Sequence, residues 1–180
     1  MKIRRIVTGH SPAGKSVFLS DTAAPRTNEF KHVPGFVTSL IWETAPGSSV
    51  PASAGDPTEI TKSWVPLAGG TNLMFVTFPP DAVMMRPSFD PAAAGGEYMQ
   101  LLPGLAEKFE MDSPGMHTTD SVDYDVVMDG EIHLELDDGV SKKLVRGDVV
   151  VQNGTRHAWR NKSDKPATML FVLVGAQRKN

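Results

Sequence analysis

Short hydrophobic runs separated by proline and glycine restrict this sequence to a mainly β structure. The chain has 14 prolines and 16 glycines in 180 residues, and both residue types interrupt regular elements. Apolar and β-branched residues cluster between these breakers, at residues 2–8, 16–19, 36–42, 72–78, 122–128, 131–136, 148–151, 156–160 and 167–174. Runs of this length bounded by turn residues are typical of strands. The sequence therefore predicts an all-β protein.

The clearest strand signal lies at residues 131–136, where Ile132, Leu134 and Leu136 alternate with polar residues, as a half-buried strand requires. Asp-Gly pairs at 129–130 and 138–139 flank this run and favour tight hairpin turns. We therefore expect residues 121–174 to form a meander of antiparallel strands. Residues 44–71 and 79–97 are rich in Pro, Gly, Ala and Ser and predict loops, while 97–110 predict a short helix broken near Pro103.

Composition excludes several classes of protein and site. The chain lacks cysteine, so any metal must be held by His, Asp or Glu. The net charge of −3 with scattered basic residues gives no electrostatic footprint for nucleic acid. No apolar run approaches the roughly 18 residues of a membrane span, and no apolar segment typical of a signal peptide follows the basic residues near the start. We expect one domain, a cytoplasmic location, and neither nucleic-acid nor membrane partners.

Residues Gly9 to Ser16 match the phosphate-binding pattern G-x-x-x-x-G-K-[ST] in full. Such a loop works only where it leads from a strand into a helix whose N-terminal amides face the phosphates. Here Ser16 is followed by a β-branched and aromatic run that ends at Pro25, so the required helix is missing. We interpret residues 9–15 as a hairpin turn between two strands and expect no nucleotide to bind.

A second group of residues, between positions 115 and 161, indicates the function. His117 is followed six residues later by Asp123 and then by Gly130, and after the meander come His157 and Asn161. In this spacing the chain resembles the cupin superfamily. The first motif of that family is Gly, then His-x-His, three or four residues, Glu, six residues and Gly. Its second motif is Gly, a short strand, Pro-x-Gly-x-x-His and three residues to Asn. The resemblance covers about residues 113–174.

The resemblance implies a metal ion held by His117, Asp123 and His157, but this chain departs from the family pattern. Thr119 stands where the second His of the first motif would be, Asp123 replaces Glu, and Gln152 replaces the motif proline. Two imidazoles and one carboxylate still form a recognised metal set with open positions. Iron, manganese, nickel and zinc all fit these ligand types.

The neighbours of this ligand set have further expected roles. A straight strand would place His117 and Asp123 roughly 20 Å apart, so the chain must turn between them. Asp120 and Asp125 are acidic neighbours, either exposed or competing as ligands. Beyond Asn153-Gly154, His157 and Trp159 share one strand face. We expect a substrate pocket that includes Thr119, Gln152 and Trp159.

The resemblance also implies a small antiparallel jelly-roll barrel with an N-terminal β extension, forming one domain overall. Residues 1–112 would supply N-terminal strands and loops, with the segment 80–114 as an apolar lid over the barrel mouth, and residues 113–176 would hold the core motifs. The family pattern further implies a homodimer in which the N-terminal strands pack against the partner's sheet.

Fold alone does not decide function in this superfamily. We expect a metal-dependent enzyme of dioxygenase, decarboxylase or lyase type, acting on a small organic acid or aromatic metabolite. Two alternatives stay open at this point. One is a barrel that binds a small molecule without turning it over, and the other is a metal-free structural cupin, which the missing histidine at Thr119 favours. The catalytic residues are not identified by the sequence.

Overall fold

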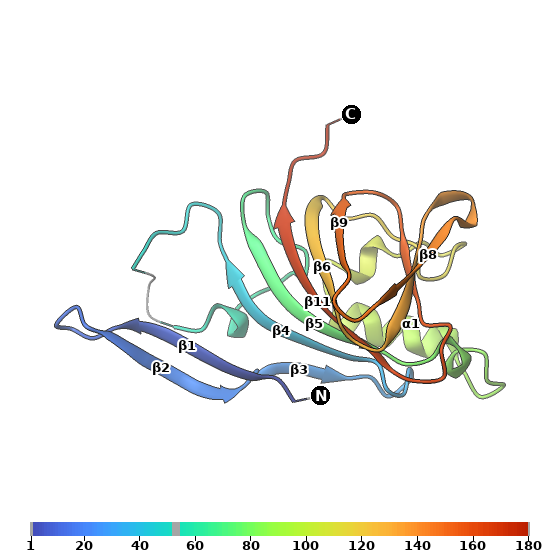
Figure 1. Ribbon diagram of the computed structural model, residues 1–180, viewed down its shortest axis with the longest axis horizontal. Helices are drawn as coiled ribbons and strands as arrows, with labels where there is room; N and C mark the ends of the chain where they lie inside the picture. The colour runs from blue at the N-terminus through green and yellow to red at the C-terminus, as the bar shows by residue number, and fades with distance from the viewer. Residues whose placement is uncertain (1, 52–54, 180) are drawn as a thin grey trace.

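The computed structural model describes residues 2–51 and 55–179, and its regular structure consists mainly of antiparallel strands (Figure 1). The strands are β1 (Arg4–His10), β2 (Ser16–Ala23), β3 (Arg26–Glu29), β4 (Val37–Thr44), β5 (Thr71–Phe78), β6 (Ser121–Asp129), β7 (Glu131–Glu135), β8 (Ser141–Val145), β9 (Val149–Asn153), β10 (Ala158–Arg160) and β11 (Ala167–Gly175). Within the described ranges they are accompanied by one α-helix, α1 (Pro91–Leu101), and four 3-10 helices: η1 (Pro57–Glu59), η2 (Asp81–Val83), η3 (Ala106–Lys108) and η4 (Asp137–Gly139).

The strands form a six-stranded sheet of order β3-β4-β5-β11-β6-β9, a three-stranded sheet of order β10-β7-β8, and a separate hairpin of β1 and β2. All strand pairings among the described residues are antiparallel. The chain passes four times between the two larger sheets, from β6 to β7, from β8 to β9, from β9 to β10 and from β10 to β11, so the sheets enclose a common interior. The predicted antiparallel jelly roll with an N-terminal β extension is confirmed.

The core lies on the inner face of the six-stranded sheet. Along β5 and β11 buried and half-buried side chains alternate, as expected for strands with one face on the core. Met74 of β5, Met169 of β11, Val127 of β6 and Ile132 of β7 are among the buried members of one hydrophobic cluster. Residues 121–174 supply most of the barrel wall, but the predicted meander is wrong: among these strands only β7 and β8 are consecutive and paired, and the chain otherwise crosses between the sheets.

Gly130 allows the chain to pass from β6 to β7, which is the first crossing between the two larger sheets. Its φ is +76°, a conformation that favours glycine. A Cβ at this position would lie 2.7 Å from the Pro166 carbonyl oxygen and 3.0 Å from the Ala167 Cα. The Asp-Gly signal at 129–130 therefore marks a tight turn, as predicted, and this turn also brings β7 onto the second sheet.

The hairpin of β1 and β2 extends away from the barrel (Figure 1). Residues 11–15 form its turn, in which the Gly14 amide donates to the Ser11 carbonyl over 2.8 Å. The sequence matching the phosphate-binding pattern is thus a hairpin turn followed by a strand, and this prediction is confirmed.

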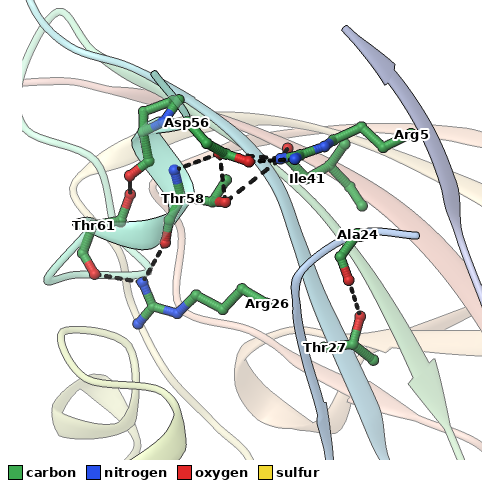
Figure 2. A network of polar contacts seen from close by, with 9 residues as sticks. Arg5, Ala24, Arg26, Thr27, Ile41, Asp56, Thr58 and Thr61 are labelled. Carbon is green, nitrogen blue, oxygen red and sulfur yellow. Dashed lines mark hydrogen bonds and ion pairs between the residues drawn. The ribbon is translucent and has the colours of Figure 1, made fainter. Parts of the chain in front are cut away.

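Buried Arg5 fastens the hairpin to the barrel (Figure 2). Its guanidinium donates to the Ile41 carbonyl of β4 over 3.1 Å and forms an ion pair with Asp56, while Arg5 itself is 7% exposed. Nearby, Arg26 of β3 donates to the carbonyl of Thr61. These two arginines hold the segment that follows residue 55 against the first strands of the chain.

The predicted helix at 97–110 is wrong in its bounds, because α1 begins at Pro91 and ends at Leu101. Asp90 caps the helix by accepting hydrogen bonds from the amides of Ala92 and Ala93 over 2.9 and 3.1 Å. Proline at the first helical position and a capping aspartate before it start a helix, so the expected loop at 79–97 ends earlier than predicted. Strands β3 and β8 carry few apolar residues, so the search for hydrophobic runs in the sequence did not predict them.

Among the residues that the structure describes, every helix is too short or too polar to span a membrane.

Candidate functional site

His117 and His157 lie side by side, although 40 positions separate them in the sequence. Each backbone amide donates to the other residue's carbonyl, over 2.9 and 3.0 Å, as an antiparallel bridge. The centroids of the two imidazole rings are 4.2 Å apart. His117 precedes β6 of the six-stranded sheet, and His157 precedes β10 of the three-stranded sheet. The bridge therefore connects the points where the chain enters the two sheets. Both histidines are buried.

The two imidazoles have the same orientation toward the backbone. Nδ1 of His117 is 3.1 Å from the Gly115 carbonyl oxygen, and Nδ1 of His157 is 2.9 Å from the Thr155 carbonyl oxygen. Because a carbonyl only accepts, each Nδ1 carries the hydrogen and each Nε2 carries a lone pair. A backbone carbonyl that fixes the tautomer in this way is common for metal-ligating histidines.

Burial keeps both imidazoles neutral. Burial, together with a smaller effect of the neighbouring His157, lowers the pKa of His117 to about 4. Burial also lowers the pKa of His157. At neutral pH the pair therefore presents two uncharged nitrogen acceptors, which can bind a metal ion or accept a proton from a ligand.

Two carboxyl groups of β6 point toward the same interior. Asp123 pairs in register with Gln152 of β9, and Asp125 follows two residues later on the same strand face. Asp123 is 4% exposed and Asp125 is 1% exposed. Oδ1 of Asp123 and both oxygens of Asp125 are buried without a hydrogen-bond partner in the described part of the chain. A folded protein rarely leaves such groups unpaired, because each costs about 1–3 kcal/mol or more.

The same burial changes the acidity of both carboxyl groups. It raises the pKa of Asp123 to about 6, against the opposing effect of the hydroxyls of Ser121 and Thr119. Burial and the charge of Asp123 together raise the pKa of Asp125 to about 8. Strongly perturbed carboxyl groups inside a barrel are characteristic of functional sites.

The predicted pocket residues lie around these groups. Thr119 is buried and its hydroxyl accepts from Ser121 over 3.0 Å. Gln152 is buried opposite Asp123 and donates to Thr155. Trp159 is half-buried, with its ring centroid 5.9 Å from that of His157, and it shares the face of His157 as predicted.

The sequence indicated Asp125 only as an exposed or competing neighbour of the ligand set, and Phe109 only as part of the predicted lid segment 80–114. Asp125 was detectable, because it has the strand parity of Asp123. Phe109, whose ring centroid is 4.7 Å from that of His117, lies eight residues upstream in the chain and has no local signal. Asp120 is excluded from the interior, since Arg178 donates to its carboxylate over 2.6 Å at the surface.

The donor set fits a metal ion only in part. The two imidazoles have the orientation and neutral state that an ion requires. However, residues 2–51 and 55–179 contain no cluster of three His, Asp or Glu side chains close enough to hold one. The ligand set of His117, Asp123 and His157 therefore stays a prediction.

Residues 109–173 match a protein-family model described as Cupin_2, cupin domain. The chain is similar to the cupin-domain-containing oxidoreductase srdB of Neurospora crassa, with 29% identity over 94% of this chain and 72% of that protein. It is also similar to phomopsin biosynthesis cluster protein C' of Diaporthe leptostromiformis, with 56% identity over 63 residues. That match spans 34% of this chain and only 33% of the relative, so the chain covers about a third of the length of this relative.

Among solved structures, the chain is similar to an RmlC-like cupin family protein with a double-stranded β-helix fold from Methanocaldococcus jannaschii. The TM-score is 0.35 at 13% identity, over 57% of this chain and 68% of that one.

Proposed function

The chain belongs to the cupin superfamily, and on this premise we propose that its barrel binds a small organic acid or aromatic metabolite and acts on it as an enzyme. Relatives of the chain are named oxidoreductases or proteins of biosynthesis clusters, which supports a role in small-molecule chemistry. In this proposal the active site of the enzyme is formed by the histidine pair and the two carboxyl groups of β6.

One observation carries the proposal: the barrel interior holds polar groups that the described chain does not pair. Asp125 has two unpartnered oxygens and Asp123 has one, while His117 and His157 each present an Nε2 lone pair. A barrel with a purely structural role would have apolar residues here, because unpaired buried groups destabilise the fold. A ligand that hydrogen-bonds these groups would remove the penalty.

The geometry suggests a division of roles. A neutral imidazole Nε2 can accept a hydrogen bond or a proton from a substrate hydroxyl. A protonated Asp125 can donate to a substrate oxygen, and Asp123 has a pKa of about 6, near the value that proton exchange at neutral pH requires. Thr119 and Gln152 border Asp123 and would orient the substrate.

A divalent transition metal remains part of the proposal. His117 and His157 would provide two imidazole ligands and Asp123 the third, with iron, manganese, nickel and zinc as candidates. When bound, such an ion would act as a Lewis acid or activate dioxygen. An ion bound there would occupy Nε2 of both histidines, so the proton-transfer roles above are those of the metal-free protein.

The experiment compares wild-type protein with His157→Ala. Both are incubated with a library of organic acids and phenols, with and without each of the four metals, and consumption is followed by mass spectrometry. We expect wild-type protein to consume at least one compound and His157→Ala to consume none. As a matched control, His10→Ala, in the hairpin, should behave as wild type. A protein that binds compounds but consumes none would be a binding module, and the proposal would be wrong.

The metal is tested on the same proteins by plasma emission after metal loading and washing. We expect about one equivalent of transition metal in wild-type protein and none in His157→Ala. Full metal content in His157→Ala would refute the ligand assignment.

We further propose that the protein is a homodimer in which the N-terminal hairpin covers a second copy of the chain. Phe18 is 78% exposed and Leu19 is 56% exposed in the hairpin, and Val149 and Val151 are exposed on edge strand β9. Both apolar surfaces belong to one chain, so a twofold axis lets each hairpin cover the partner's sheet. Light scattering should give a dimer for wild-type protein and a monomer for Phe18→Ser. A monomeric wild type would contradict the proposal.

A further inference from the structure

Aromatic rings continue from the histidine pair in both directions. On one side the ring of Phe109 is 4.7 Å from that of His117, centroid to centroid. Tyr98 of α1 then stacks on Phe109 at 5.9 Å. This first arm runs from the histidine bridge to the helix that follows Asp90.

The second arm runs along the strands. Trp159 of β10 contacts His157 edge-on at 5.9 Å, and Phe171 of β11 contacts Trp159 at 5.7 Å. Phe78 of β5 follows Phe171 at 6.3 Å. These neighbours are T-shaped, an arrangement that aromatic rings favour.

Phe36 joins the two arms. Its ring centroid is 5.7 Å from that of Phe78 and 5.4 Å from that of Tyr98. The rings therefore form a closed loop that begins and ends at the histidine pair, and we call this loop the aromatic belt. It draws on α1, on three strands of the barrel and on the segments around residues 36 and 109.

The belt is not fully covered by protein. Phe36, Phe78, Tyr98, Phe109 and Trp159 are half-buried, although all but Phe109 also pack against the buried core. These rings thus keep surface that the described chain leaves open. Binding sites for small molecules typically combine aromatic walls with a few polar groups, and here the polar groups are the two imidazoles.

We propose that the aromatic belt selects a planar aromatic or conjugated metabolite, and that a hydroxyl group of this ligand donates to Nε2 of His117 or His157. This inference rests on the proposed function, because it uses the same interior, and it narrows the substrate class from organic acids or aromatic metabolites to planar hydroxylated aromatic or conjugated ones. Planar rings stack or meet edge-on with the belt, whereas a saturated ring lacks the π face that these contacts require. The imidazoles accept through Nε2, so the polar group of the ligand must be a donor.

Three small probes separate these requirements: phenol, cyclohexanol and anisole. Phenol has both the planar ring and the hydroxyl, cyclohexanol lacks the planar ring, and anisole lacks the donor. Affinities are measured by NMR titration of ¹⁵N-labelled, chelator-treated full-length protein, in which Nε2 of both histidines is free. We expect phenol to bind about 2- to 12-fold more tightly than each of the other two, the range for one aromatic contact or one hydrogen bond. Equal affinity for phenol and cyclohexanol would overturn the inference.

Variants locate the binding. Phe109→Leu and Trp159→Leu each remove one ring of the belt and keep an apolar side chain, and each should reduce the preference for phenol over cyclohexanol by about 2-fold or more. Phe75→Leu makes the same change at a half-buried position on the other face of β5, outside the belt, and should leave the preference unchanged. Circular dichroism shows whether each variant is folded, and the use of two belt variants keeps the test valid if one fails to fold. An unchanged preference in a folded belt variant would place phenol elsewhere and refute the inference.

The failure of this inference can be told apart from failure of the proposed function. If wild-type protein consumes a saturated acid but shows no preference for phenol, the substrate class is wrong and the enzyme proposal stands. If phenol is preferred and no library compound is consumed, the aromatic site stands and the enzyme proposal fails.

Discussion

Asp125→Asn should make the protein more stable, and the gain should grow with pH. Asp125 is 1% exposed and neither of its oxygens has a partner in the described residues. Asparagine has the same shape and cannot ionise. The substitution therefore removes the cost of a buried carboxyl group that the unfolded chain prefers to ionise.

The direction of this pH dependence follows from the raised pKa of Asp125, which is about 8 in the folded protein against the usual 3.8. Below about pH 4 the carboxyl group is protonated in both states, so the penalty of ionisation vanishes. Between about pH 4 and pH 8 the unfolded state loses its proton first, so the folded state becomes less stable as pH rises. Above about pH 8 the penalty is constant.

Within this pH window the free energy of unfolding falls by about 1.4 kcal/mol for each pH unit. At pH 7 the penalty amounts to about 4 kcal/mol, and at pH 5 to between about 1 and 2 kcal/mol. Asp125→Asn should be more stable than wild-type protein by these amounts. Because Asp125 belongs to the proposed site, the stabilised variant should also lose activity on any substrate found, as is common where strained groups serve function.

The assay is urea unfolding of chelator-treated protein at pH 5, 6 and 7. Asp129→Asn serves as the matched control, because Asp129 lies on the same strand and is exposed, so its effect should stay within about 0.5 kcal/mol at each pH. A stability difference between Asp125→Asn and wild type that does not change with pH would refute the reasoning.

Three further predictions concern the scaffold. Gly130→Ala should cost about 3 kcal/mol, because a clash adds to the strain of a positive φ, whereas Gly139→Ala, at φ +71° with nothing within 4 Å of the new Cβ, should cost only about 1 kcal/mol. Equal losses in urea unfolding would contradict this. Asp56→Ala should cost about 3 kcal/mol by leaving Arg5 buried without its counter-ion, and a loss within experimental error would show that the pair does not hold the hairpin. Lys15→Ala should change the stability by no more than about 0.5 kcal/mol, and ATP should not bind in calorimetry. Micromolar ATP affinity that Lys15→Ala abolishes would prove the hairpin interpretation wrong.

Local signals in the sequence determined much of the fold. Alternating apolar residues at 131–136 predict β7, and the Asp-Gly pair before it predicts the turn, because both depend on neighbours within a few residues. The spacing from His117 to His157 also indicated the family from sequence alone. Short-range signals failed where propensity was weak, as in the polar edge strand β3, and where the capping pair Asp90-Pro91 was overlooked.

The chemistry of the interior was decided by the tertiary structure. Nothing near Asp125 in the sequence shows that both its oxygens lack partners, because that depends on how β6 is registered against β9 and β11. The contact between His117 and His157 requires the chain to pass between two sheets. The closure of the aromatic belt through Phe36 requires strands and a helix from distant parts of the chain to meet. Sequence spacing supplies candidate side chains, but only the packing of the two sheets brings them together and determines which of them remain without a partner.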